Sequence, residues 1–248
     1  IDSPTTSINA VFVVQQSLDT NNSIKAFVSS TRGVTWEGPV TLTGASDNPV
    51  FYPKVGLDSS GYAIAVWEGF DTGTYVTYAS RTTGSASAPA WSTKEIISST
   101  TIDNQDPQLS VAPLGKAMSI WWQGVPTAAG TIRTNYFNGT SWGSEQSSIS
   151  PSMKQASFPN VAINDNGRAF AVWIITGNTG APSTIQVSQF NGTSWSSHPK
   201  TLTQFTTIDA TSDNRTQICT NINNQTVAVW TANVNGFAVI QAAMFNGN

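Results

Sequence analysis

The stretch of sequence that decides the fold is Ala63-Ile64-Ala65-Val66-Trp67, an apolar run that ends in tryptophan. The same pattern returns at residues 117–121, 169–173 and 226–230, and a version that ends in valine occupies residues 10–14. The final positions of the five runs follow one another at intervals of 52 to 57 residues. A repeat of this length indicates an array of equivalent structural units.

Two further positions keep a fixed distance from each tryptophan. Fourteen residues before it stand Pro53, Pro107, Pro159 and Thr216. Six residues before it stand Gly61, Gly115, Gly167 and Asn224. Proline punctuates strand ends, and glycine or asparagine accepts the positive φ of a tight turn. The register therefore predicts the same short strand, tight turn and apolar strand in each unit.

The rest of each unit predicts two more strands. An alternating strand such as residues 184–190 leads to a turn such as Phe137-Asn138-Gly139-Thr140-Ser141-Trp142. Asn-Gly between apolar runs is typical of a hairpin whose two central residues both have φ > 0. Antiparallel units with two apolar faces cannot bury themselves alone, and radial packing around an axis buries them. We predict an all-β fold, a five-bladed β-propeller of four-stranded antiparallel blades.

The repeat divides the chain into approximate units at residues 1–49, 50–104, 105–156, 157–212 and 213–248, which we interpret as one propeller domain over residues 1–248. The last unit stops inside its hairpin motif, before the expected fourth strand. We expect the N-terminal segment to help close the ring. A piece cut from a longer array is the alternative.

The composition of the chain argues against several classes of function and predicts where the protein is located. Only 10% of the 248 residues are charged and the net charge is −3, so the chain lacks the positive footprint of a nucleic-acid-binding protein. No apolar run approaches the roughly 20 residues that span a bilayer. The sparse charge predicts an extracellular or cell-surface location, and we expect a monomer. Cys219 is the only cysteine, which excludes an intrachain disulfide, and its apolar surroundings predict a buried thiol.

One hairpin resembles a known motif. Residues 29–36, Ser-Ser-Thr-Arg-Gly-Val-Thr-Trp, are similar to the Asp-box hairpin of bacterial neuraminidase repeats, with Thr31 in place of the aspartate. The units also resemble bacterial secreted β-propeller repeats, and a count of five blades is similar to tachylectin-type lectins and to glycosidases with five-bladed catalytic domains. The resemblance implies the fold and says little of function, because an Asp box is a structural hairpin.

Several kinds of catalytic site are disfavoured by the residue inventory. His198 is the only histidine and lies in a polar stretch, which argues against a nucleophilic triad. No Cys and His cluster predicts zinc, so we expect no cofactor, with Ca²⁺ as a possibility. The expected loops of one propeller face carry Asp19, Asp47, Glu68, Asp71, Asp103, Asp106, Asp209 and Asp213, with Lys154 as the chief basic residue. Either these are ordinary turn residues, or they form an electronegative face that binds a cation or a polyhydroxyl ligand.

The candidate binding residues are Trp122, Glu68, Asp71, Asp106 and Asp213. Trp122 follows Trp121 at a position where the other units hold unrelated residues, so it should face the opposite side of its strand, near the acidic loops. The four repeat tryptophans are expected in the core between blades. Trp36, Trp142 and Trp195, which follow the hairpin turns, are expected there too.

These residues favour a non-catalytic extracellular binding or adhesion module whose loop face contacts a glycan or a protein. A purely structural propeller is one alternative. The other is a five-bladed glycoside hydrolase, in which Glu68, Asp106 and Asp213 lie near the mouths of the inner strands and supply paired carboxylates.

Overall fold

The computed structural model describes residues 9–18, 21–44, 47, 49–83, 90–125, 129–151, 154–177, 183–204, 216–234 and 236–246. Every regular element over these residues is a β-strand. None of the described residues builds a helix of the length and apolarity that a bilayer crossing requires. The prediction of an all-β chain is confirmed.

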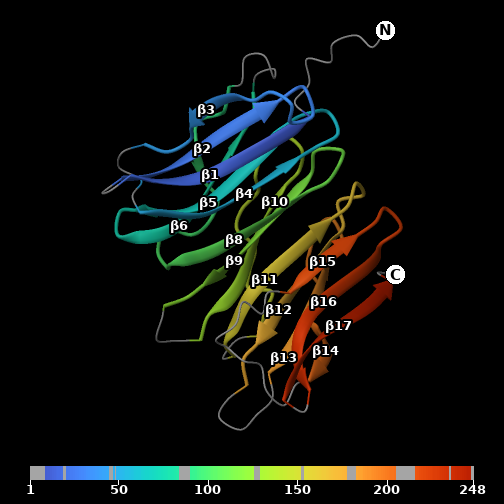
Figure 1. Cartoon of the computed structure of the whole chain (residues 1–248). Helices are drawn as coiled ribbons and strands as arrows, with labels where there is room; N and C mark the ends of the chain where they lie inside the picture. The colour runs from blue at the N-terminus through green and yellow to red at the C-terminus, as the bar shows by residue number, and fades with distance from the viewer. Residues whose placement is uncertain are drawn as a thin grey trace.

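The strands form five antiparallel sheets, which follow one another in chain order and are called blades 1 to 5 below (Figure 1). Blade 1 contains β1 (Ala10–Leu18), β2 (Asn21–Ser29) and β3 (Glu37–Thr41). Blade 2 contains β4 (Val50–Leu57), β5 (Ala63–Asp71), β6 (Thr74–Arg81) and β7 (Glu95–Ile96). Blade 3 contains β8 (Asn104–Val111), β9 (Ala117–Gln123) and β10 (Thr131–Phe137). Blade 4 contains β11 (Ala156–Ile163), β12 (Ala169–Ile175), β13 (Thr184–Phe190) and β14 (Lys200–Gln204). Blade 5 contains β15 (Gln217–Thr220), β16 (Gln225–Val234) and β17 (Phe237–Asn246).

The number of paired strands varies from blade to blade. Among the described residues, blades 2 and 4 have four strands and blades 1, 3 and 5 have three, so the four expected strands are not seen in every blade. Over that part of the chain blade 1 lacks a first strand, because β1 carries the apolar run at residues 10–14 and β3 follows Trp36 as a fourth strand does, whereas blade 3 lacks the fourth strand. In blade 3 its place is taken by an isolated bridge between Phe137 and Trp142, after which Gln146 and Ile149 donate single backbone hydrogen bonds to β10. The segment still follows the sheet edge there, without a continuous ladder.

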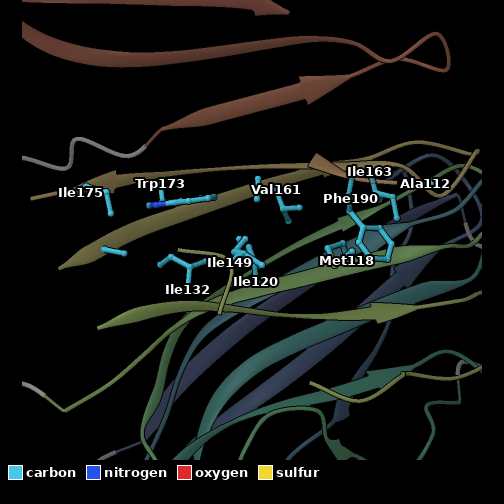
Figure 2. Close-up of a cluster of buried hydrophobic side chains, with 13 residues drawn as sticks. Ala112, Met118, Ile120, Ile132, Ile149, Val161, Ile163, Trp173, Ile175 and Phe190 are labelled. Carbon is cyan, nitrogen blue, oxygen red and sulfur yellow. The ribbon is translucent and has the colours of Figure 1, made fainter. Parts of the chain in front are cut away.

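The repeat tryptophans form the core between blades, as predicted. Trp67, Trp121 and Trp173 are fully buried and Trp230 nearly so. Each packs against the preceding blade, and Figure 2 shows the cluster in which Trp173 of blade 4 lies above Ile120 and Ile132 of blade 3. Burying an aromatic side chain of this size is among the largest single contributions to a core. The apolar runs of the sequence therefore form the contacts that pack one sheet against the next.

The two kinds of turn differ in how well the sequence predicted them. Gly61, Gly115 and Gly167 have φ of 87°, 86° and 78°, and Asn224 has 61°, which confirms the positive φ expected six residues before each tryptophan. In the Asn-Gly hairpins only the glycines, Gly139 and Gly192, have positive φ. The expectation of two such residues is wrong, because each asparagine side chain instead accepts two backbone hydrogen bonds. Asn138 Oδ1 accepts from Thr140 and Ser141 at 2.8 and 3.0 Å.

The two ends of the stack leave apolar side chains uncovered. Blade 1 and blade 5 lie at opposite ends in Figure 1, and the principal contacts join consecutive blades. Trp36 is exposed and so is Cys219, against the expectation that both are buried, because no described blade covers the outer faces of blades 1 and 5. The segment expected to close the ring, residues 1–8, lies outside the described residues. The count of five blades in a closed ring, the single domain and its unit boundaries stay predictions.

Candidate functional site

The inner strands of blades 2, 3 and 4 share a bulge at the repeat proline. Their pairing registers shift between Phe51 and Lys54, between Gln105 and Gln108, and between Ser157 and Asn160. The residue before the proline has a φ of 50° at Tyr52, 51° at Asp106 and 51° at Phe158. Left-handed backbone at non-glycine residues costs about 1–3 kcal/mol and is concentrated at functional sites. Three consecutive blades thus place one side chain each at an equivalent point.

Two adjoining cavities lie at these bulges, and together they are called the bulge site. The first, of about 370 Å³, is lined by Phe51, Tyr52, Glu68, Tyr75, Gln105, Asp106 and Phe158. The second, of about 220 Å³, is lined by Gln105, Asp106, Trp122, Gln155, Ser157 and Phe158. A larger cavity of about 480 Å³ lies at the opposite ends of the strands, where its one carboxyl group, Asp58, is only partly buried. The bulge site, in contrast, contains the buried carboxyl group of Glu68.

Glu68 of β5 is the buried acid of the site. Its side chain is 3% exposed, and Oε2 accepts a 2.9 Å hydrogen bond from the backbone N–H of Asp106. The pKa of Glu68 is raised from 4.5 to about 7, chiefly by burial; the hydrogen bond from Asp106 acts in the opposite direction, and the charges of Asp106 and Asp103 add to the increase. Glu68 is therefore partly protonated near neutral pH.

Asp106 and Asp103, the two carboxylates whose charges act on Glu68, are each held in place by a hydrogen bond. Asp106 Oδ1 accepts a 3.0 Å hydrogen bond from Gln108 Nε2, two residues along β8. Asp103 Oδ1 accepts a 3.0 Å hydrogen bond from the backbone N–H of Tyr75, which ties the link between blades 2 and 3 to β6. Both carboxylates are thereby fixed near Glu68, which is the arrangement that places negative charge beside a buried acid.

The link between blades 2 and 3 is stiffened by Asn104. Its Nδ2 donates to the carbonyl oxygens of Tyr75, Ser99 and Ile102 at 2.6–3.1 Å. Its Oδ1 accepts from Trp121 Nε1 at 2.8 Å and from Gln123 Nε2 at 2.9 Å. A fully satisfied buried amide of this kind specifies one local structure. It positions the start of β8, and hence Asp106.

Trp122 enters the site from β9, on the face opposite Trp121, as the alternation of a strand predicts. Its indole lies against two glycines, since a Cβ added to Gly130 would stand 1.7 Å from Trp122 Nε1 and one added to Gly124 would stand 2.8 Å from Cζ2. The ring is partly buried against the cluster of Figure 2 and lines the second cavity. Glycine at these two positions is what makes room for the ring.

Three of the five predicted site residues are brought together. Glu68, Asp106 and Trp122 line the bulge site. Asp71 does not, because it lies at the tip of the β5–β6 hairpin, where Oδ2 accepts a 3.4 Å hydrogen bond from Thr72. Asp213 lies outside the described residues.

The acidic loops are less electronegative than the sequence suggested. Asp47 is buried, accepts a hydrogen bond from the backbone N–H of Gly44, and forms an ion pair with Lys94, a basic residue not expected on this face. Within the described ranges no three His, Cys, Asp or Glu side chains are grouped as metal ligands. Binding of Ca²⁺ stays a prediction.

Sequence reasoning identified Trp122 but missed two other aromatic side chains of the site. Tyr52 and Phe158 line the first cavity, one on each side of Asp106 in the order of the blades. The signal that identifies them is their position directly before the repeat proline, fifteen residues before the tryptophan. Asp106 occupies the same position in blade 3.

No protein-family model matches the chain, and no curated protein matches its sequence. Solved structures do match. An ulvan lyase, described as a polysaccharide lyase, superposes with a TM-score of 0.55 at 10% identity, over 95% of this chain and 64% of the lyase. A second polysaccharide lyase gives 0.53 at 5% identity, over 94% and 55% of the two chains. A protein of unknown function from Dyadobacter fermentans gives 0.53 at 13% identity, over 93% and 70%.

These likenesses show the fold, which is a β-propeller as predicted, while the number of blades is not shown by them. The chain spans 64% of the length of the ulvan lyase that it matches. The comparison also corrects the functional interpretation. Two of these structural neighbours are polysaccharide lyases, a finding that contradicts the interpretation of the chain as a non-catalytic binding module.

Proposed function

We propose that the chain hydrolyses glycosidic bonds at the bulge site, with Glu68 as the general acid and Asp106 as the second carboxylate. The observation that carries the proposal is the buried Glu68, whose pKa is raised to about 7 directly beside Asp106. A general acid is most effective when its pKa lies near the working pH. Glycoside hydrolysis commonly uses two carboxyl groups, one of them proton-loaded.

The reaction follows from these two groups. Protonated Glu68 transfers its proton to the glycosidic oxygen as the bond to the anomeric carbon breaks, and the departing sugar leaves as an alcohol. The ionised carboxylate of Asp106 either removes a proton from the attacking water or attacks the anomeric carbon itself, and water then releases the sugar. Inversion or retention of configuration in the product distinguishes the two routes.

Hydrolysis suits the lining better than elimination does. A lyase removes a proton next to a uronate carboxylate, and that step is assisted by a cation that neutralises the developing charge. The residues that line the two cavities include neither Lys, Arg nor His. The lining instead supplies an acid, Glu68, beside a carboxylate, Asp106.

The proposal also covers the class of substrate, the location of the enzyme and its oligomeric state. The polysaccharide lyases among the structural neighbours support a glycan as the substrate. We also propose an extracellular, monomeric enzyme, on the sparse charge and the abundance of neutral polar residues in the sequence. Fractionation of the native cells and light scattering of the purified chain test these two points.

The test is the release of reducing ends from a panel of neutral polysaccharides (arabinan, galactan, xylan) and acidic ones (ulvan, pectate). Glu68→Gln should lower the rate on the best substrate by at least about a hundredfold, since general acid catalysis contributes about 10²–10⁴. Glu95→Gln, an exposed carboxylate on β7, is the matched control and should leave the rate unchanged.

Three results would overturn the proposal. One is that wild type and Glu68→Gln act equally on every substrate. Another is that products carry the ultraviolet absorbance of an unsaturated uronide, which identifies a lyase. The third is that no polysaccharide of the panel is cleaved by a correctly folded chain.

A further inference from the structure

The three pre-proline side chains form a row across the bulge site. Tyr52 of blade 2 and Phe158 of blade 4 line the first cavity on either side of Asp106 from blade 3, and Glu68 lines the same cavity. Tyr52 is 48% exposed, although an aromatic side chain normally gains by burial. The row therefore offers two aromatic faces beside a pair of carboxyl groups.

A third aromatic side chain continues this row into the second cavity. Trp122 lines that cavity together with Asp106 and Phe158, which both cavities share. Together the two spaces, of about 370 and 220 Å³, fall within the roughly 300–1,000 Å³ of small-molecule sites. An occupant that follows the lining passes from Tyr52 over the carboxyl groups to Trp122.

The polar lining sets the charge that this occupant can carry. Glu68 and Asp106 are the only Asp, Glu, Lys or Arg residues among those that line the two cavities. An anionic group placed there meets like charge and finds no cation, which disfavours it. The side chains of Tyr75, Gln105 and Gln155 offer neutral donors and acceptors, which suit hydroxyl groups.

We propose that the bulge site binds an uncharged glycan chain through at least two consecutive sugar rings. One ring lies between Tyr52 and Phe158 above the carboxyl groups, and the next lies on Trp122. The location rests on the proposed function, whereas the binding itself does not require that Glu68 and Asp106 catalyse hydrolysis. The apolar faces of sugar rings account for the aromatic side chains, and the hydroxyl groups account for the neutral polar ones.

The experiment measures binding in the Glu68→Gln background, so that no substrate is consumed. Arabinan, galactan and xylan are compared with ulvan and pectate by affinity electrophoresis, and the best ligand is then followed by calorimetry as a monosaccharide, disaccharide and trisaccharide. Neutral chains should bind and acidic ones should not. The disaccharide should bind at least about tenfold more tightly than the monosaccharide, which corresponds to about 1.4 kcal/mol.

Variants assign the two rings. Tyr52→Ala and Trp122→Phe should each weaken binding of the disaccharide by roughly three- to tenfold, since stacking on an aromatic side chain contributes on the order of 1 kcal/mol. Tyr62→Ala is the matched control, because Tyr62 is 57% exposed and lies at the opposite ends of the strands. It should change the affinity by less than twofold. Tyr52 is exposed, so this variant remains folded even if Trp122→Phe loosens the core.

The outcomes separate this inference from the proposed function. Tight binding of a neutral chain that the wild-type protein does not cleave removes the hydrolase and leaves the binding site. Preference for ulvan or pectate overturns the inference, whether or not cleavage occurs. Absence of binding by every neutral chain, or equal affinities of Tyr52→Ala and the parent, overturns it as well.

Discussion

The backbone N–H of Asp106 donates a 2.9 Å hydrogen bond to Oε2 of Glu68, across the interface between blades 2 and 3. The donor belongs to the bulge of β8 in blade 3, and the acceptor belongs to β5 in blade 2. This bond lowers the pKa of Glu68 while burial raises it by more. The packing of two neighbouring blades therefore sets the protonation of the candidate acid.

Glu68 should make the stability of the protein depend on pH. Its pKa is about 7 in the folded state and close to 4.5 when the chain is unfolded. Between these values the unfolded chain loses the proton that the folded chain keeps, so stability falls as pH rises, by about 3 kcal/mol at most. Glu68→Gln carries no titrating proton. The stability gained by this variant over wild type should be smallest below about pH 4.5, grow through the interval and level off above about pH 7.

Urea unfolding at a series of pH values measures this difference. Glu37→Gln, on the exposed strand β3, controls for the removal of one negative charge. A gap between wild type and Glu68→Gln that shrinks as pH rises would contradict the assignment, because it would mean that the folded state favours the ionised carboxylate.

Asp106→Asn should lower the pKa of Glu68. The charge of Asp106 raises that pKa, and asparagine removes the charge while it keeps the backbone N–H, an acceptor for Gln108 and tolerance of a left-handed φ. Titration of the Glu68 carboxyl carbon by NMR measures the change. Asp165→Asn, in a turn at the opposite ends of the strands, is the control and should leave the titration midpoint where it is. An unchanged midpoint in Asp106→Asn would show that the two groups do not interact.

The fold was predictable because its determinants repeat along the chain. Trp67, Trp121 and Trp173 are core residues in equivalent places, and Gly61, Gly115 and Gly167 meet the same backbone demand in each turn. A pattern that is copied can be recognised without a structure. The fourth strand expected in blade 3 is not formed as a ladder, since only single backbone hydrogen bonds such as those of Gln146 and Ile149 join that segment to β10.

The candidate site was predictable only in part, because its residues differ from blade to blade. Trp122 was identified as a departure from the repeat, and Glu68 and Asp106 as carboxylates of the expected loop face. Tyr52 and Phe158 look like ordinary apolar residues before a proline, and only the positive φ at the bulge places them beside Asp106. The raised pKa of Glu68 was equally hidden, since it arises from burial by a neighbouring blade.

Gly130→Ala should disturb the position of Trp122. A Cβ at residue 130 would overlap the indole, so the ring must move or the backbone must shift, at a cost of about 1–3 kcal/mol. The matched control is Gly143→Ala, where the nearest atom to the new Cβ would be 3.5 Å away, an ordinary contact. That change should leave stability unaltered or raise it by about 0.4–1 kcal/mol. Thermal unfolding with near-ultraviolet circular dichroism compares the two, and equal behaviour would mean that Trp122 does not lie against Gly130.

Substitution of two methionines tests which faces of the blades are covered in solution. Met118 of β9 has no exposed surface and packs in the cluster between blades 3 and 4, whereas Met244 of β17 is 79% exposed on the outer face of blade 5. Met118→Ala should therefore cost about 2–5 kcal/mol of stability, and Met244→Ala less than about 0.5 kcal/mol. Chemical denaturation of both variants measures the contrast. A large loss in Met244→Ala would show that another surface covers blade 5 in solution, either a further part of the same molecule or a second copy, and light scattering would distinguish these two sources.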